Sequence, residues 1–250
     1  MSGHSKWANR VHRKTRQDAK RSATFAKISR QIIVAAREGG GNPDMNPRLR
    51  LAIAEGKGSE MPNDNIEYAI KRGTGDLEDV HYEPGQYDAF APAGVALLVN
   101  VLTDNKTRTV ADVRHILKKA GGSMGGVGTV TWMFEQKGVI LVPKEGVDGD
   151  ELFMAAVDAG ADDVIDSEES WEIQTDPKAF QAVYDALQAA GYTFERAELT
   201  MIPTNTTPVS DADASKVLRL LDNLNDHDDV QRVYANFEIS DEALEAYEAA

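Results

Sequence analysis

Apolar residues recur every three or four positions near the N-terminus, which is the pattern of an amphipathic helix. Residues 22–37 place Phe25, Ile28 and Ile32 on one side of such a helix. The glycines at 39–41 end it, because glycine enters left-handed backbone geometry at the lowest cost. The pattern therefore predicts one helix from residue 22 to residue 37.

Two more helices are predicted before residue 76. Asn46-Pro47 starts one, since proline in the first turn lacks only an N–H that has no partner there. Met61-Pro62 opens the other, and the glycines at 73 and 75 close it. Residues 1 to about 75 are thus expected to be all helical.

Beyond residue 75, strand and helix periodicities alternate. The first part predicts, in chain order, strand 86–90, strand 95–102, helix 108–120 and strand 129–134, and the C-terminal part predicts helix 211–224 and strand 230–237. Residues 138–202 follow the order strand, helix, strand, strand, helix, strand, which is that of the ferredoxin-like split unit.

These patterns predict an α+β multidomain fold, with a helical N-terminal domain and two ferredoxin-like α+β domains, one inserted in the other. The expected domains are a basic helical nucleic-acid-binding domain at 1–76, a discontinuous α+β domain at 77–137 plus 203–250, and an inserted α+β domain at 138–202.

Charge is distributed unevenly along the chain. The whole protein of 250 residues has a net charge of −14, yet residues 1–37 hold ten Lys or Arg and one Asp, a net charge of +9. Residues 1–75 carry +8 and residues 76–250 carry −22. At physiological salt the Debye length is about 8 Å, so acidic domains further away barely alter the local field of a basic one.

Signals of enzymatic chemistry are absent from the sequence. The chain has no cysteine, and its five histidines form no His-Glu-x-x-His motif. The glycine-rich run 121–128 lacks the Gly-Lys-Ser/Thr ending of a phosphate loop and follows a helix, so we interpret it as a connecting loop. We therefore expect no catalytic residue, no metal and no cofactor.

Three other conspicuous groups of residues have simple structural interpretations. The acidic clusters at 162–169 and 226–229 do not match calcium-loop spacing and are interpreted as solvated surface charge. Trp132 and Phe134 are expected to lie in the core on one strand face.

The apolar runs are too short for a membrane helix, which needs about 20 residues, and the N-terminus lacks the apolar segment of a secretory signal. We expect a cytoplasmic protein with no membrane partner. A mitochondrial transit peptide is the alternative for the basic, acid-poor N-terminus.

The basic segment is the candidate binding site. Arginine donors match phosphate oxygens, and neutralising phosphates releases counterions and gives affinity. Aromatic rings interleaved with the charges could stack on unpaired bases. The candidate residues are Lys6, Arg10, Arg13, Lys14, Arg16, Lys20, Arg21, Lys27, Arg30 and Arg37, together with Trp7 and His12.

Several motifs together resemble the YebC/PmpR family. They include Gly3-His4-Ser5-Lys6-Trp7-Ala8-Asn9, Asn46-Pro47-Arg48-Leu49-Arg50, Met61-Pro62-Asn63-Asp64-Asn65-Ile66-Glu67, Thr103-Asp104-Asn105-Lys106 and Trp132-Met133-Phe134. The resemblance implies three domains, no enzymatic activity, and either DNA-binding transcription regulation or a ribosome-associated role like that of the mitochondrial translational activator of cytochrome oxidase. It also implies a nucleic-acid surface over Lys6, Trp7, Asn9, Arg10, His12, Arg13 and Lys14, with Lys20, Arg21, Lys27 and Arg30 adjoining.

The chain departs from the family pattern in two places. The family's Pro-Gly-Gly is Pro92-Ala93-Gly94 here, which argues against a role that needs a positive φ at residue 93. Gly56 and Gly58 replace the usual alanine or lysine, so the second helix is expected to be shorter.

The sequence thus predicts a non-enzymatic nucleic-acid-binding regulator of gene expression. A translation factor that binds ribosomal RNA on the ribosome is favoured, since no helix-turn-helix is evident and short basic-aromatic motifs suit irregular RNA. The alternative is a DNA-binding transcriptional regulator. A second alternative is a protein-interaction scaffold whose basic segment docks acidic partners.

Overall fold

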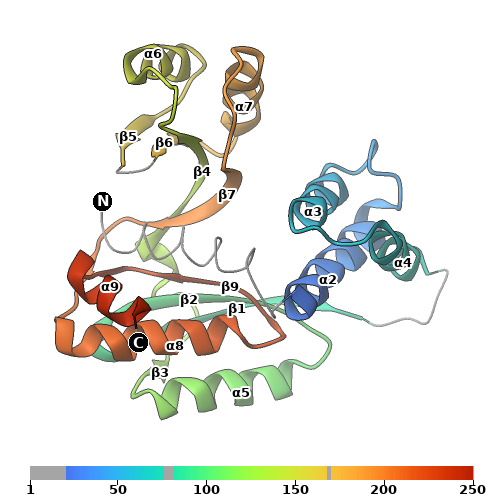
Figure 1. Cartoon of the computed structure of the whole chain (residues 1–250). Helices are drawn as coiled ribbons and strands as arrows, with labels where there is room; N and C mark the ends of the chain where they lie inside the picture. Colours follow the sequence, from blue (N-terminus) through green and yellow to red (C-terminus); the bar gives the residue numbers. More distant parts are fainter. Residues whose placement is uncertain (1–20, 76–80, 168–169, 250) are drawn as a thin grey trace. The chain divides into compact units, whose positions relative to one another are not determined.

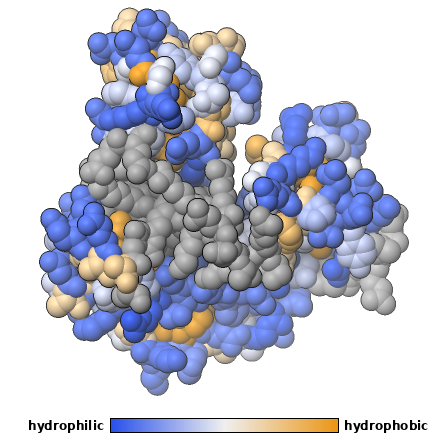
Figure 2. Space-filling model, in the orientation of Figure 1, coloured by the Kyte–Doolittle hydropathy of each residue, from blue (hydrophilic) through white to orange (hydrophobic). Residues whose placement is uncertain are grey.

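The computed structural model describes residues 21–75, 81–167 and 170–249, and the fold is mixed α+β with antiparallel sheets (Figure 1). The chain divides into two compact units, one of which comprises residues 132–206. The other unit is built from the described residues before and after that segment. Hydrophilic residues make up most of the coloured surface in Figure 2.

Three helices form the N-terminal part of the larger unit: α2 (Arg21–Gly39), α3 (Pro47–Gly58) and α4 (Asn63–Thr74). All three were predicted from periodicity. Their shared core includes Ile28, Ile32, Leu49 and Ile66, each at most 4% exposed. A Cβ atom on Gly73 would lie 2.5 Å from the carbonyl oxygen of Ile33, so α2 and α4 can approach this closely only because residue 73 is glycine.

Asn46 joins the end of α2 to the start of α3. Its side-chain oxygen accepts a hydrogen bond from the N–H of Leu49 at 3.1 Å, which caps α3. Its Nδ2 donates to the carbonyl oxygens of Ala35 at 2.7 Å and Gly40 at 2.9 Å. The helix α3 includes both Gly56 and Gly58 and ends at Gly58.

The larger unit also contains a four-stranded antiparallel sheet with the order β3-β1-β2-β9. Its strands are β1 (Glu83–Phe90), β2 (Ala96–Thr103), β3 (Ser123–Met124) and β9 (Val230–Ala235). The helices α5 (Lys106–Lys119) and α8 (Asp211–Asn225) lie side by side on one face of the sheet (Figure 1). Burial explains this packing, because Leu97 and Val99 of β2 join Val113 of α5 and Leu221 of α8 in one core.

The prediction of a strand at 129–134 is wrong. Residues Thr131–Met133 form a 3₁₀ turn, and the next strand begins at Phe134. The buried carboxylate of Asp88 accepts hydrogen bonds from the N–H of Val130 at 2.9 Å and from the hydroxyl of Thr131 at 3.0 Å, which holds this segment in a turn. Trp132 is accordingly 66% exposed and outside the core, whereas Phe134 is buried as predicted.

The smaller unit contains β4 (Phe134–Pro143), α6 (Gly149–Asp158), β5 (Asp163–Asp166), β6 (Ser170–Thr175), α7 (Phe180–Ala189) and β7 (Arg196–Pro203). Its strands form an antiparallel sheet in the order β5-β6-β4-β7. Ile140 and Ile173 of the sheet pack with Leu152 of α6 and Leu187 of α7. The alternation of strands and helices here is the one that the sequence predicts.

One feature of the backbone differs from the sequence prediction. Ala93 has φ 62° in the short 3₁₀ turn Pro92–Gly94, so the β1–β2 connection uses a left-handed residue although no glycine stands there. The hydrogen bond from Ala91 N–H to the Val95 carbonyl, 2.8 Å, closes that connection and holds the strained residue.

The C-terminal segment adds elements that were not predicted. A short parallel pair joins β8 (Thr207–Pro208) to β10 (Phe237–Glu238), and α9 (Asp241–Glu248) follows. Ser240 caps α9 by accepting from Ala243 N–H at 3.1 Å. The Ser-Asp-Glu start was a helix signal that could have revealed it.

Candidate nucleic-acid interface

Most of the predicted site lies outside the described residues. These positions are Lys6, Trp7, Asn9, Arg10, His12, Arg13, Lys14, Arg16 and Lys20. Arg21 begins α2, and its side chain is also outside the description. The structure therefore gives the surroundings of three predicted residues, Lys27, Arg30 and Arg37.

Two of these cations contact the turn that connects α8 to β9. The ammonium of Lys27 donates to the carbonyl oxygen of Asn225, and the guanidinium of Arg30 donates to the carbonyl oxygen of Asp228. One residue further on α2, the side-chain amide of Gln31 lies 3.2 Å from that of Gln231 on β9. The predicted basic face of α2 thus binds acceptors of the same chain.

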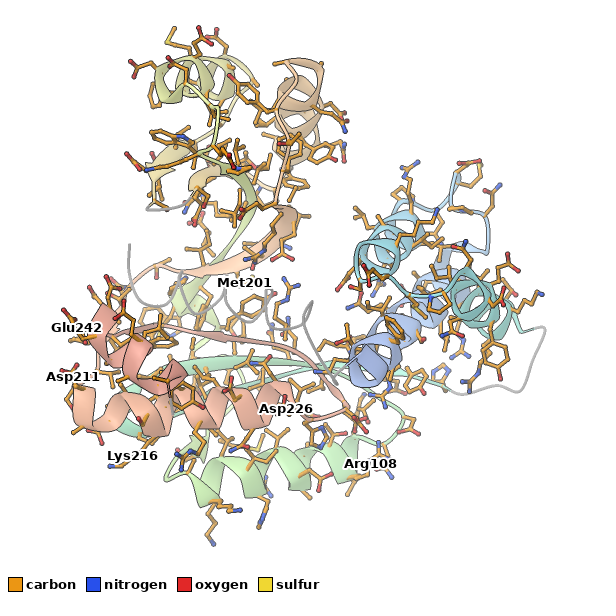
Figure 3. All side chains as sticks on the ribbon, viewed as in Figure 1. Arg108, Met201, Asp211, Lys216, Asp226 and Glu242 are labelled. Carbon is orange, nitrogen blue, oxygen red and sulfur yellow. The ribbon has the colours of Figure 1, made fainter. Side chains whose placement is uncertain are left out.

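Arg30 also enters a group of polar side chains around one buried carboxylate, which we call the Asp229 cluster: Arg30, Thr103, Arg108, Thr109 and Asp229. Asp229 is 2% exposed. Its Oδ1 lies 3.2 Å from the Arg30 guanidinium, and its Oδ2 accepts from Arg108 and Thr109 at 2.8 and 2.7 Å. Figure 3 shows Arg108 near the start of α5.

The electrostatics of the cluster favour the ionised form of Asp229. Burial disfavours the charge, but hydrogen bonds from Arg108 and Thr109 and the positive charges of Arg108 and Arg30 outweigh it, so the pKa of Asp229 lies below its ordinary value. The same contact raises the pKa of Arg108. The interpretation of 226–229 as solvated charge is therefore wrong for Asp229, while Asp226 and Asp228 are exposed.

The other contacts of this face involve the segment that precedes β1. The Arg30 guanidinium lies 5.4 Å from the ring centroid of Tyr82, and Arg37 forms a 2.9 Å hydrogen bond with Nδ1 of His81. Arg30 is only 16% exposed. Lys27, Arg30 and Arg37 thus lie along one helix, and each contacts a partner within the chain.

Other cations of the helical part are exposed or half-buried. Arg50, Lys57 and Lys71 are exposed, and the Arg72 guanidinium lies 5.9 Å from the ring centroid of Tyr68. These cations lie outside the unopposed run of charge before residue 38, so the charge pattern alone does not single them out. The i, i+4 spacing of Tyr68 and Arg72 on a predicted helix was a signal that could have found them.

The glycine-rich run belongs to the edge of the sheet. Within it, Ser123–Met124 forms β3, which pairs with β1, and Gly125 N–H donates to the carbonyl of Asp88 at 2.8 Å. A Cβ on Gly122 would lie 2.5 Å from the Phe90 carbonyl oxygen, so glycine there serves close strand packing. The loop connects a helix to strands, as predicted.

A search of the described residues for groups of three or more histidine or carboxylate side chains that could hold a metal ion finds none. In the same part of the chain, no helix combines the length and the apolar composition needed to cross a membrane.

Comparisons with known proteins cover nearly the whole chain. Two family models match, "TACO1/YebC protein N-terminal domain" at residues 5–76 and "TACO1/YebC second and third domain" at residues 82–237. A protein of Persephonella marina named "Probable transcriptional regulatory protein" is 53% identical over 98% of this chain and 99% of its own length. A relative in Geobacter sulfurreducens with the same kind of name is 51% identical over 98% of this chain and 99% of its own length.

A solved structure is also similar. A conserved hypothetical protein from Aquifex aeolicus is 45% identical and superposes with a TM-score of 0.81, covering 90% of this chain and 93% of that one.

Proposed function

Because the chain belongs to the TACO1/YebC family, we propose that it is a non-enzymatic regulator of gene expression that binds nucleic acid through its N-terminal helical part. The α+β parts either position the helical part or meet a protein partner. This role needs no cofactor and no metal.

The separation of charge along the chain is the observation that carries the proposal. Residues 1–75 have a net charge of +8 and residues 76–250 have −22. A polyanion would be attracted to the first part and repelled by the rest, which orients the protein on its target. The names of the relatives, which describe transcriptional regulatory proteins, support a role in gene expression.

For the target we favour RNA, including ribosomal RNA, because Trp7 and His12 stand among the cations of residues 6–16 and suit unpaired bases. DNA is the second candidate, and the names of the relatives favour it. A basic segment that binds only acidic proteins is the third.

We also propose a division into three domains, with a ferredoxin-like domain inserted into a second α+β domain. The strand order β5-β6-β4-β7 with helices after the first and third strands of the unit supports the insertion. The compactness of residues 132–206 supports it as well.

The test combines crosslinking in cells with a charge-reversed variant. Ribosomal RNA recovered by crosslinking and sequencing supports the translational role, promoter DNA supports the transcriptional role, and recovery of neither contradicts nucleic-acid binding. Arg13→Glu with Lys14→Glu should abolish the recovery. Lys118→Glu with Lys119→Glu is the matched control, since both residues are exposed near the end of α5 and the change in net charge is the same.

A further inference from the structure

Tyr68 points away from the core of the helical part. The core face of α4 consists of Ile66, Ala69 and Gly73, whereas Tyr68 is 56% exposed. An aromatic side chain that is not needed for packing is available for a ligand, although a single exposed ring is common on protein surfaces. The charges near Tyr68 distinguish a ligand-binding ring from an ordinary exposed one.

Cations adjoin the ring on the same helix. Arg72 follows Tyr68 by one helical turn, and its guanidinium lies 5.9 Å from the ring centroid. Lys71 is exposed beside it. Among the described residues neither Lys71 nor Arg72 forms an ion pair, whereas Arg48 pairs with Glu38.

Acidic residues limit where an anion could bind on this helix. Asp64 and Glu67 are exposed on α4, and Asp64 lies one turn before Tyr68. Their charges disfavour phosphate at the start of the helix. A phosphate would therefore lie toward Lys71 and Arg72, at the other end.

We propose that the α4 surface, formed by Tyr68, Lys71 and Arg72, is a binding site for an unpaired nucleotide. A base stacks on the exposed ring of Tyr68, and the adjoining phosphates bind Lys71 and Arg72. This inference rests on the proposed function and extends it from the basic N-terminal segment to α4. It also specifies single-stranded nucleic acid, because paired bases do not offer their faces for stacking.

The stacking is tested with two variants of Tyr68 in the full-length protein. The probe is a single-stranded RNA oligonucleotide of about 12 nucleotides, and a duplex of the same sequence is measured in parallel by fluorescence anisotropy. Tyr68→Ala should weaken single-strand binding about tenfold, while Tyr68→Phe keeps the ring and should bind like the wild type. Duplex affinity should change less than twofold in both.

Leu51→Ala is the matched control, since Leu51 is 61% exposed on α3 and has no ring. An equal loss of affinity in Leu51→Ala and Tyr68→Ala would overturn the proposal. So would an equal loss on single strand and duplex.

The phosphate contacts are tested by the salt dependence of binding. Lys71→Ala with Arg72→Ala should reduce the slope of log K against log salt by about 1.4, since each phosphate contact contributes about 0.7 on a single strand. Lys118→Ala with Lys119→Ala removes the same charge from the exposed end of α5, outside the helical part, and should leave the slope unchanged. Because cations in the last turn also offset the helix dipole, folding is verified in each variant by its thermal midpoint.

Failure of the two proposals gives different results. A wild-type protein that binds neither RNA nor DNA contradicts the proposed function and this inference together. A wild type that binds, with the α4 variants indistinguishable from their controls, contradicts only the inference about α4.

Discussion

The cations of α2 and those of α4 lie on helices that share one hydrophobic core, yet the partners of their side chains differ. Lys27 and Arg30 on α2 donate to carbonyl oxygens of the α8–β9 turn, and Arg30 also reaches the buried carboxylate of Asp229. Lys71 and Arg72 on α4 have no carboxylate partner within the described chain. A count of charges in the sequence does not distinguish these two pairs, whereas among the described residues Lys27 and Arg30 have internal acceptors and Lys71 and Arg72 have none.

The difference arises from burial. A carboxylate that is 2% exposed requires compensation, because an unpaired buried charge is costly. Side chains of α2, of the end of β2 and of α5 compensate the charge of Asp229. Arg30 therefore stabilises the fold in addition to contributing positive charge to α2. Lys71 and Arg72 of α4 compensate no buried carboxylate among the described residues.

The largest effect should follow from removal of the buried carboxylate. We expect Asp229→Ala to lower the free energy of unfolding by about 3 kcal/mol or more, because it leaves Arg30 and Arg108 without their shared partner. Urea denaturation measures the loss. Asp228→Ala, at the exposed neighbour, should change stability by less than about 0.5 kcal/mol, and equal losses in both variants would show that the cluster is not special.

A direct comparison of the two helices comes next. Arg30→Met should cost about 2 kcal/mol, since it removes a charged donor from a buried carboxylate. Arg72→Met should cost less than about 0.5 kcal/mol, since surface contacts of this kind contribute little. Both variants replace a guanidinium side chain by a shorter, unbranched apolar one, so similar unfolding midpoints in urea would show that the two arginines contribute equally to stability.

The pH dependence of stability should identify the same carboxylate. The pKa of Asp229 is lowered in the folded state, so its contribution is fully present above its unfolded pKa of about 3.9 and is lost as pH falls through the folded value. The stability difference between wild type and Asp229→Asn should be constant from about pH 5 to 7 and shrink below about pH 4. A difference that grows in acid would mean that the pKa is raised instead.

The smallest change in stability is expected from variants of the two tyrosines that contact arginines. Tyr82 lies 5.4 Å from the Arg30 guanidinium and packs against the helical core, whereas Tyr68 lies 5.9 Å from Arg72 and is exposed. We expect Tyr82→Leu to lower stability by about 1 kcal/mol and Tyr68→Leu by about 0.3 kcal/mol. Equal values in thermal unfolding would indicate that the surroundings of the two rings do not differ energetically.

Local signals in the sequence were sufficient for most of the helices and strands before residue 207, but not for all of them. The spacing of Phe25, Ile28 and Ile32 predicted α2, and Asn46-Pro47 predicted the start of α3 because the asparagine cap and the proline act within one turn. The alternation of Trp132 and Phe134 predicted a strand wrongly, since the decisive hydrogen bonds come from Asp88, more than 40 residues earlier.

The candidate site was predictable in its charge but not in its geometry. Nothing near Asp229 in the sequence shows that it is buried, because its partners Arg108 and Arg30 are about 120 and 200 residues away. The backbone at Ala93 was not predictable from the local sequence either. A non-glycine residue takes a positive φ there because the β1–β2 hairpin closes around it.

Binding of nucleic-acid phosphates by the helical part is tested by the salt dependence of RNA binding by the intact protein. If about six phosphates are neutralised, log K should fall against log salt with a slope of about −4 to −5. Arg13→Glu with Lys14→Glu should flatten that slope and weaken binding. Binding that is flat in salt and unaffected by this variant would contradict the account.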